Sequence, residues 1–232
     1  MKGIAIYVEG GATPQQKNDL RIGFDQLIGP QKVAAQSKRL RWKTVFSGSR
    51  NGAYDKFINA VRRSDEETLH ILLVDSEEGL TAEASKPPDE APEEEDRRNH
   101  SDAQTRRAHL VNRDNWDLGD IPSQHIHLMV RCMESWIASD IEALAGYYLQ
   151  GFQANILPAR PNLEDEPKDS LYDKLRRATR NSQTKGEYSK TNHAHKLLGL
   201  IDPKKIAARC PRFMTFTRWL DEQILNNGQT AC

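Results

Sequence analysis

The 232-residue sequence contains no apolar run that approaches the roughly 20 residues a membrane-spanning helix needs. Its amino terminus passes directly into an expected strand and lacks the apolar segment and cleavage site of a secretory signal peptide. The chain has three cysteines, Cys132, Cys210 and Cys232, an odd number with no zinc-ligand spacing. We therefore expect a cytoplasmic protein in a reducing compartment, without membrane contact and without structural zinc.

Two other features are also missing from the sequence. It has no Gly-x4-Gly-Lys-Ser/Thr phosphate loop, so we do not expect intrinsic ATPase activity of that type. It also has no internal repeat. A chain of this length buries a substantial core, either as one large domain or as one domain with an appendage.

The net charge is zero, but the charges are segregated along the chain. Residues 31–63 carry nine Lys or Arg against one acid, and residues 168–212 carry twelve against four. Residues 83–98 carry seven acids against three bases. Clustered basic faces indicate a polyanionic partner such as nucleic acid. Solvated helix faces would give the same pattern, and this alternative stays open.

The first 74 residues alternate between strand and helix patterns over the segments 3–8, 14–28, 42–46, 54–61 and 68–74. This order predicts an α/β fold with a mostly parallel sheet flanked by helices. Residues 83–102 are acidic and contain three prolines. Apart from these prolines, the segment has no apolar residue larger than alanine. That composition predicts a disordered or mobile insertion.

Regular structure is expected to resume near His109, with a fourth strand over residues 126–130 and a helix after it. Three further helices are expected, over residues 168–180, 188–200 and 211–225. We therefore predict two regions. Residues 1–146 would form the α/β domain, with the acidic insertion at about 83–104, and residues 147–232 would form a basic, helical C-terminal region.

Carboxylates follow two of the expected strands. Glu9 lies in Val-Glu-Gly-Gly after the first strand, and Asp75 and Glu77 follow the third. Ligands of parallel sheets gather at the carboxyl ends of the strands, and grouped carboxylates are ligands for Mg²⁺. An extended backbone would point Asp75 and Glu77 the same way. The alternative is that Glu9 caps the next helix and Asp75 ends its strand at an ordinary turn.

Other polar residues follow the fourth strand or lie on it. Glu134 is a candidate fourth ligand, or else an acid in the first turn of a helix, where the dipole stabilises it. Asp140 is expected to be structural or solvated. His125 and His127 alternate on the strand, but no third nitrogen ligand accompanies them, so we expect them at the surface.

Three basic residues are candidates for holding the phosphates of a nucleic acid: Arg50, Lys185 and Lys190. Arg50 follows the turn after the second strand. Lys185 and Lys190 lie in Lys-Gly-Glu-Tyr-Ser-Lys, between two basic helices. A loop with a solvated helix start explains each of the two lysines equally well.

These residues resemble the bacterial domain-of-unknown-function 4276 family. The matching stretches cover most of the chain outside the acidic insertion, at residues 6–11, 20–24, 47–50, 74–77, 128–140, 185–190 and 197–203. That family is similar to a divergent Toprim domain, the fold of topoisomerases, primases and overcoming-lysogenization nucleases. The resemblance therefore implies a Toprim-like sheet.

The resemblance also implies a magnesium site. In Toprim proteins a Glu after the first strand and an Asp-x-Asp pair after the third hold Mg²⁺, and these map onto Glu9, Asp75 and Glu77. The second Asp of the pattern is replaced here by Glu77. Family members are often encoded beside an ATPase of the ABC or structural-maintenance type in apparent anti-phage loci, which implies such an ATPase as partner.

Our leading hypothesis is a nuclease that uses Mg²⁺, or Mn²⁺, held by Glu9, Asp75 and Glu77 to hydrolyse DNA or RNA. The alternative is a non-catalytic nucleic-acid-binding or regulatory subunit of an ATPase complex. Residues 83–102 leave the sheet beside the proposed site. They would act as a flap that mimics nucleic acid, or as an inert insertion. A homo-oligomer remains open.

Overall fold

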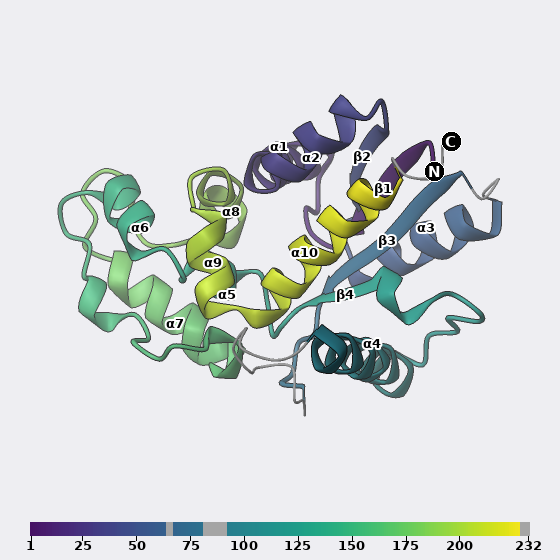
Figure 1. Ribbon diagram of the computed structural model, residues 1–232. Helices are drawn as coiled ribbons and strands as arrows, with labels where there is room; N and C mark the ends of the chain where they lie inside the picture. Colours follow the sequence, from purple (N-terminus) through teal and green to yellow (C-terminus); the bar gives the residue numbers. More distant parts are fainter. Residues whose placement is uncertain (64–66, 81–91, 228–232) are drawn as a thin grey trace.

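The computed structural model describes residues 1–63, 67–80 and 92–227 (Figure 1). Its centre is a sheet of four parallel strands in the order β2-β1-β3-β4. The strands span β1 Gly3–Val8, β2 Arg41–Phe46, β3 Thr68–Asp75 and β4 Ile126–Met129. The predicted parallel α/β sheet is therefore confirmed, and so is the expected fourth strand.

The sheet lies between two layers of helices because alternate side chains of its strands enter two separate apolar clusters. Ile4, Ile6 and Val8 of β1 pack in one cluster with α1 Pro14–Leu27, α2 Gly29–Ser37 and α10 Pro211–Asn226. Ala5 and Tyr7 pack in the other, with α3 Arg50–Arg63 and α4 Pro92–Asp114. Burial on both faces explains why β1 and β3 read as continuous apolar runs.

The remaining helices form the part of the molecule beyond β4 (Figure 1). Their bounds are α5 Glu134–Ile137, α6 Ile141–Tyr148, α7 Lys168–Thr179, α8 Lys190–Leu198 and α9 Pro203–Arg209. Three short 3-10 turns lie at Ser123–His125, Ala154–Ile156 and Leu163–Asp165. The last helix, α10, returns to cover the sheet, so residues of both predicted regions share one core. The division at residue 146 stays a prediction.

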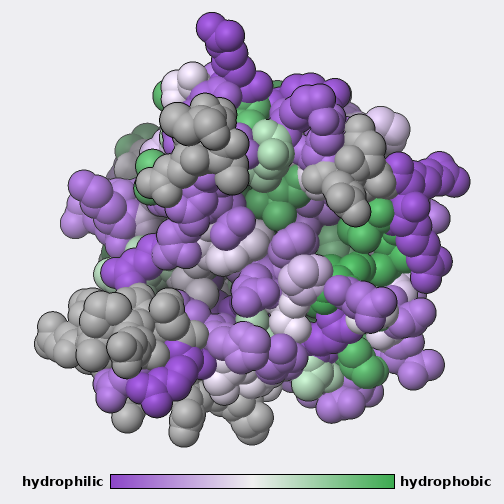
Figure 2. Space-filling view, turned by 45° about the vertical axis from the view of Figure 1, so that its right-hand side comes forward, coloured by the Kyte–Doolittle hydropathy of each residue, from purple (hydrophilic) through white to green (hydrophobic). Residues whose placement is uncertain are grey.

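The surface in Figure 2 is mainly hydrophilic, with hydrophobic residues in smaller areas. This distribution agrees with the enclosure of most large apolar side chains in the two clusters. Among the described residues, no helix combines the length and apolar character needed to cross a membrane.

The prediction of disorder over residues 83–102 is wrong for its second half. Helix α4 begins at Pro92 and continues to Asp114, whereas residues 83–91 lie outside the described part of the chain. The helix packs on the sheet through Leu110, and Ala103 is buried as well. Asp102 is also buried there, because Arg106 and Arg212 both pair with it. The pair with Arg212 joins residues 110 positions apart, so it cannot be seen in the local composition.

The expectation that His127 lies at the surface is also wrong. Helix α10 covers this part of β4, and the His127 ring lies 5.0 Å from the Phe216 ring and 4.8 Å from the Trp219 ring, between centroids. Burial lowers the pKa of His127 well below its ordinary value, so the imidazole is neutral at pH 7. His125 is only half-buried, near Trp219.

Helices α1 and α8 cross so closely that only glycine fits at one position of α1. A Cβ atom at Gly23 would overlap the backbone carbonyl oxygen of His195. Gly199 offers a control, because a Cβ there would meet only the movable amide end of Gln26. The crossing holds α8 beside α1, and Lys190 at the start of α8 reaches the carboxyl end of β3.

We expect Gly23→Ala to destabilise the protein by about 1–3 kcal/mol, the usual cost of overpacking. Helix propensity alone predicts the opposite sign, a gain of about 1 kcal/mol. Denaturant unfolding measures the difference, with Gly199→Ala as the control expected to change the unfolding free energy far less. A Gly23→Ala protein as stable as wild type would contradict the close crossing.

Candidate metal centre

Three carboxylates meet where two neighbouring strands end. Glu9 directly follows β1, Asp75 is the last residue of β3, and Glu77 follows two positions later. One carboxylate oxygen from each lies within 4.8 Å of the others. β1 and β3 pair in parallel with Val8 opposite Leu73, which brings both strand ends to one edge. The sequence prediction that these three acids come together is confirmed in the geometry.

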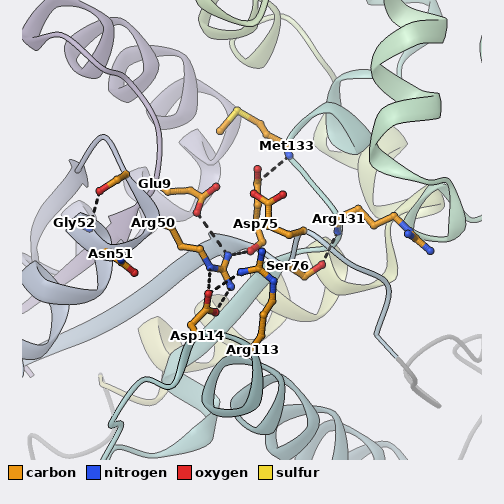
Figure 3. A network of polar contacts seen from close by, with 12 residues as sticks. Glu9, Arg50, Asn51, Gly52, Asp75, Ser76, Arg113, Asp114, Arg131 and Met133 are labelled. Atoms are coloured by element: carbon orange, nitrogen blue, oxygen red, sulfur yellow. Dashed lines mark hydrogen bonds and ion pairs between the residues drawn. The ribbon is translucent and has the colours of Figure 1, made fainter.

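The turn that carries Asp75 and Glu77 is fixed by hydrogen bonds to the segment after β4 (Figure 3). Asp75 Oδ1 accepts from the Met133 backbone N–H at 3.1 Å, and Ser76 Oγ accepts from the Arg131 N–H at 2.7 Å. Glu77 has a left-handed backbone, with φ of 67°. The expected extended backbone is therefore wrong, and it is this turn that brings Glu77 towards the other acids.

Glu9 is held by a turn that requires glycine. Gly10 and Gly11 have φ of 125° and 75°, and a Cβ on Gly11 would lie 2.7 Å from the Lys17 backbone nitrogen. The cap of α1 is Thr13, whose side chain accepts from the Gln16 N–H. Glu9 is therefore not the cap of the following helix, and that alternative is excluded.

Burial makes the negative charge of this site costly. Asp75 is 1% exposed, and its pKa is raised well above the ordinary value, first by burial and then by the charge of Glu9. Burial also raises the pKa of Glu9. Glu9 Oε2 is buried without a hydrogen-bond partner, at 3.7 Å from Arg50 Nη1. A buried carboxylate oxygen that lacks a hydrogen bond and lies among other carboxylates suits a hard divalent cation, which takes oxygen ligands.

Arg50 supports the site from α3 (Figure 3). Its Nε and Nη2 donate to the Asp114 carboxylate at 3.0 and 2.8 Å, and its Nη1 donates to the Asp75 carbonyl oxygen. The guanidinium also lies 5.1 Å from the centroid of the Trp116 ring. Since these groups occupy its donors, Arg50 positions the strand end, and its predicted contact with nucleic acid stays untested.

Helix α4 adds a second support that the sequence did not reveal. His109 Nε2 lies 2.8 Å from the Ser76 carbonyl oxygen, and Asp114 at the end of α4 holds Arg50. Both residues follow the acidic stretch that was expected to be disordered. Nothing in the local sequence marks them as neighbours of Asp75, because the contacts join segments more than thirty residues apart.

Two lysines reach the carboxylates from the C-terminal helices. Lys168, the first residue of α7, forms an ion pair with Glu77 Oε2. Lys190, the first residue of α8, lies 3.7 Å from Asp75 Oδ2 and 3.5 Å from Glu134 Oε2, measured from Nζ. The sequence pointed to Lys190 but not to Lys168, which lay unmarked at the start of the basic stretch.

Glu134 belongs to the surroundings of the site rather than to the group of three acids. It lies in the first turn of α5, is buried, and accepts a hydrogen bond from the Tyr188 hydroxyl at 3.1 Å. Lys190 pairs with both Glu134 and Asp75. The first-turn interpretation of Glu134 fits this geometry, and a ligand role remains a prediction.

The other candidates lie in different surroundings. Asp140 is structural as expected, because it caps α6 through the Ala143 N–H at 3.0 Å and pairs with Lys205 at 2.9 Å. Lys185 is exposed, and its ammonium lies 5.1 Å from the centroid of the Tyr147 ring.

Cavities lie at both ends of the sheet. A cavity of about 190 Å³ adjoins the carboxylates and includes Glu9 and Asp75 in its wall. A larger cavity of about 530 Å³ lies at the opposite end, where Thr68 begins β3 and His125 precedes β4. We assign the chemistry to the smaller cavity because Glu9 and Asp75, two of the three grouped acids, line it.

Residues 13–221 match the family model described as Domain of unknown function (DUF4276). The chain belongs to this family. The matched range contains Asp75, Glu77, Lys168 and Lys190, whereas Glu9 precedes it. No curated protein and no solved structure matches the chain with significant similarity.

Proposed function

We propose that this DUF4276 protein is a Mg²⁺-dependent nuclease with a Toprim-like sheet that hydrolyses phosphodiester bonds of DNA or RNA. The observation that carries the proposal is the meeting of Glu9, Asp75 and Glu77 at adjacent strand ends, with Glu9 Oε2 buried there without a hydrogen-bond partner. Acids in this position are costly without a cation, and Mg²⁺ or Mn²⁺ would remove the cost.

Glu9, Asp75 and Glu77 would hold the cation. A divalent ion bound there supplies an activated water and neutralises the charge that develops on the phosphate. The replacement of the second Toprim Asp by Glu77 is compatible with this role. The left-handed turn at Glu77 brings its carboxylate into the group of three, so this position still provides an acid.

The lysines supply positive charge next to the acids. Lys168 and Lys190 project from helices of the basic stretch and end beside Glu77 and Asp75. The ammonium groups of both lysines now neutralise these acids. A phosphate that enters the site would therefore lie close to both ammonium groups. This positive charge suits a polyanionic substrate, and Lys185, an exposed residue before α8, is a further candidate for contacting it.

The direct test is cleavage by the purified protein. With Mg²⁺ or Mn²⁺ we expect hydrolysis of at least one of plasmid DNA, single-stranded DNA and tRNA, alone or together with a neighbouring ATPase. Glu9→Gln removes the charge but keeps the shape, and it should lower the rate by at least about 100-fold, because even outer-shell partners of a metal cost about 10–100-fold. Equal cleavage by both proteins would contradict the proposal.

A non-catalytic regulatory subunit is the second candidate, and one observation favours it. Each of the three acids already has a basic partner, Lys168 for Glu77, Lys190 for Asp75 and Arg50 for Glu9, so the site is partly neutralised without a cation. A phage-protection assay separates the two functions. A structural subunit would tolerate Glu9→Ala combined with Asp75→Ala, whereas a nuclease effector would lose protection.

The proposed context is an anti-phage system with an ATPase of the ABC or structural-maintenance type. It rests on the family resemblance and on the lack of a phosphate loop in this chain. The neighbouring gene provides a simple check. An ATPase gene would support a two-component system, and a housekeeping operon would count against it.

A further inference from the structure

The cavity beside the acids combines charged and apolar walls. Glu9 and Asp75 form the side that belongs to the sheet edge, and Lys190 contributes a positive charge from α8. Leu20 of α1 and Met133 of the segment after β4 provide apolar surface. Such a combination suits a ligand with one charged and one apolar part, and the charged part would lie beside the proposed reaction centre.

The walls come from rigid elements. Leu20 lies on α1, and its Cδ1 is the nearest side-chain atom to the position that a Cβ on Gly10 would take, at 3.2 Å. His195 lies on α8, opposite α1 across the crossing at Gly23. Burial lowers the pKa of His195, so its ring is neutral at pH 7 and suited to contact a flat, uncharged group.

The volume limits what can enter. At about 190 Å³ the cavity is smaller than the roughly 300–1,000 Å³ of sites that enclose a drug-sized ligand. It has room for a fragment such as one base, and not for a base pair. A base inside a duplex reaches such a cavity only after it has left its stack, which costs a few kcal/mol.

We propose that this cavity receives the base of one unpaired nucleotide, against Leu20, Met133 and His195, with the attached phosphate towards Lys190 and the acids. The preferred substrate is then a single strand, or a duplex with an unpaired base, rather than an intact duplex. This inference rests on the proposed function, because it places the phosphate beside the three carboxylates.

The test compares the binding of a fluorescein-labelled 12-nucleotide DNA strand with that of its duplex, by fluorescence anisotropy at low salt with Ca²⁺ in place of Mg²⁺. We expect the wild type to bind the single strand at least tenfold more tightly. Leu20→Trp fills the cavity and should remove this preference. Ile22→Trp is the matched control, because Ile22 lies on the same helix, exposed and outside the cavity wall, and should leave it unchanged.

Thr191→Trp provides a second way to block the cavity. Thr191 is exposed and lines the cavity, so a tryptophan there closes the cavity from the surface without changing the core. It should also remove the preference for the single strand. Equal wild-type affinity for strand and duplex, or unchanged preference in both blocking variants, would overturn the inference.

Failure of the cavity assignment can be distinguished from failure of the proposed nuclease function by measuring cleavage as well as binding. If wild type and both blocking variants cleave strand and duplex alike, the cavity assignment fails and the nuclease stands. If no protein cleaves but the single-strand preference disappears in the blocking variants, the cavity assignment stands and the nuclease fails.

Discussion

Replacing Asp75 by asparagine is expected to abolish metal-dependent cleavage while leaving the metal-free protein at least as stable as wild type. Asp75 is 1% exposed and lies among other acids, so its charge is unfavourable in the fold. Asparagine keeps an oxygen that can accept from the Met133 N–H but removes the charge that a cation requires. We expect the rate to fall by at least about 100-fold, because loss of even an outer-shell partner of a metal costs about 10–100-fold.

Stability measured with and without metal provides the second readout for this variant. A ligand that binds only the folded state stabilises it by about 2.7 kcal/mol at a concentration of 100 times its Kd. Wild type should therefore unfold at higher denaturant in Mn²⁺ than in chelator, whereas Asp75→Asn should show no difference. Asp173→Asn, an exposed acid on α7, is the control and should respond as wild type. An undiminished Mn²⁺ effect in Asp75→Asn would contradict the metal site.

The second large effect concerns a buried group of charges that joins α4 to α10. Arg212 Nε donates to Asp102 Oδ1 at 3.0 Å, and its Nη1 donates to Glu164 Oε2 at 3.2 Å. Arg106 also pairs with Asp102, and all four side chains are 3–5% exposed. Asp102→Ala leaves two arginines without this carboxylate, so we expect a loss of about 3–5 kcal/mol in the unfolding free energy.

Denaturant unfolding measures this loss, and an exposed pair provides the control. Asp173 and Arg177 form an ion pair with side chains that are 60% and 53% exposed. Asp173→Ala should therefore change the unfolding free energy by less than about 1 kcal/mol. A similarly small loss in Asp102→Ala would show that the buried group does not hold α4 in place.

The sequence predicted the centre of the fold because β1 and β3 are buried on both faces and leave continuous apolar runs. It predicted the meeting of Glu9 and Asp75 because both acids directly follow such runs. It did not predict the left-handed backbone of Glu77, since that turn depends on hydrogen bonds to the segment after β4, including one from Glu77 N–H to the Arg131 carbonyl oxygen.

The features that the local sequence did not predict depend on contacts between distant segments. Lys168 meets Glu77 although the two residues are separated by 91 positions. His127 is buried because α10 returns from the end of the described chain to cover β4. Helix α4 forms within an acidic segment, where Asp102 pairs with Arg212 of α10. In each case the local sequence favours a surface or disordered residue, and tertiary packing overrides it.

The central claim is that Glu9, Asp75 and Glu77 form a site for a divalent cation. Isothermal titration calorimetry of the metal-free protein with Mn²⁺ tests this claim most directly, because the measurement needs neither substrate nor partner. We predict saturable binding to wild type that is lost when Glu9→Gln and Asp75→Asn are combined, and retained in Asp173→Asn. The absence of saturable binding to wild type, or equal binding to the double variant, would contradict the account.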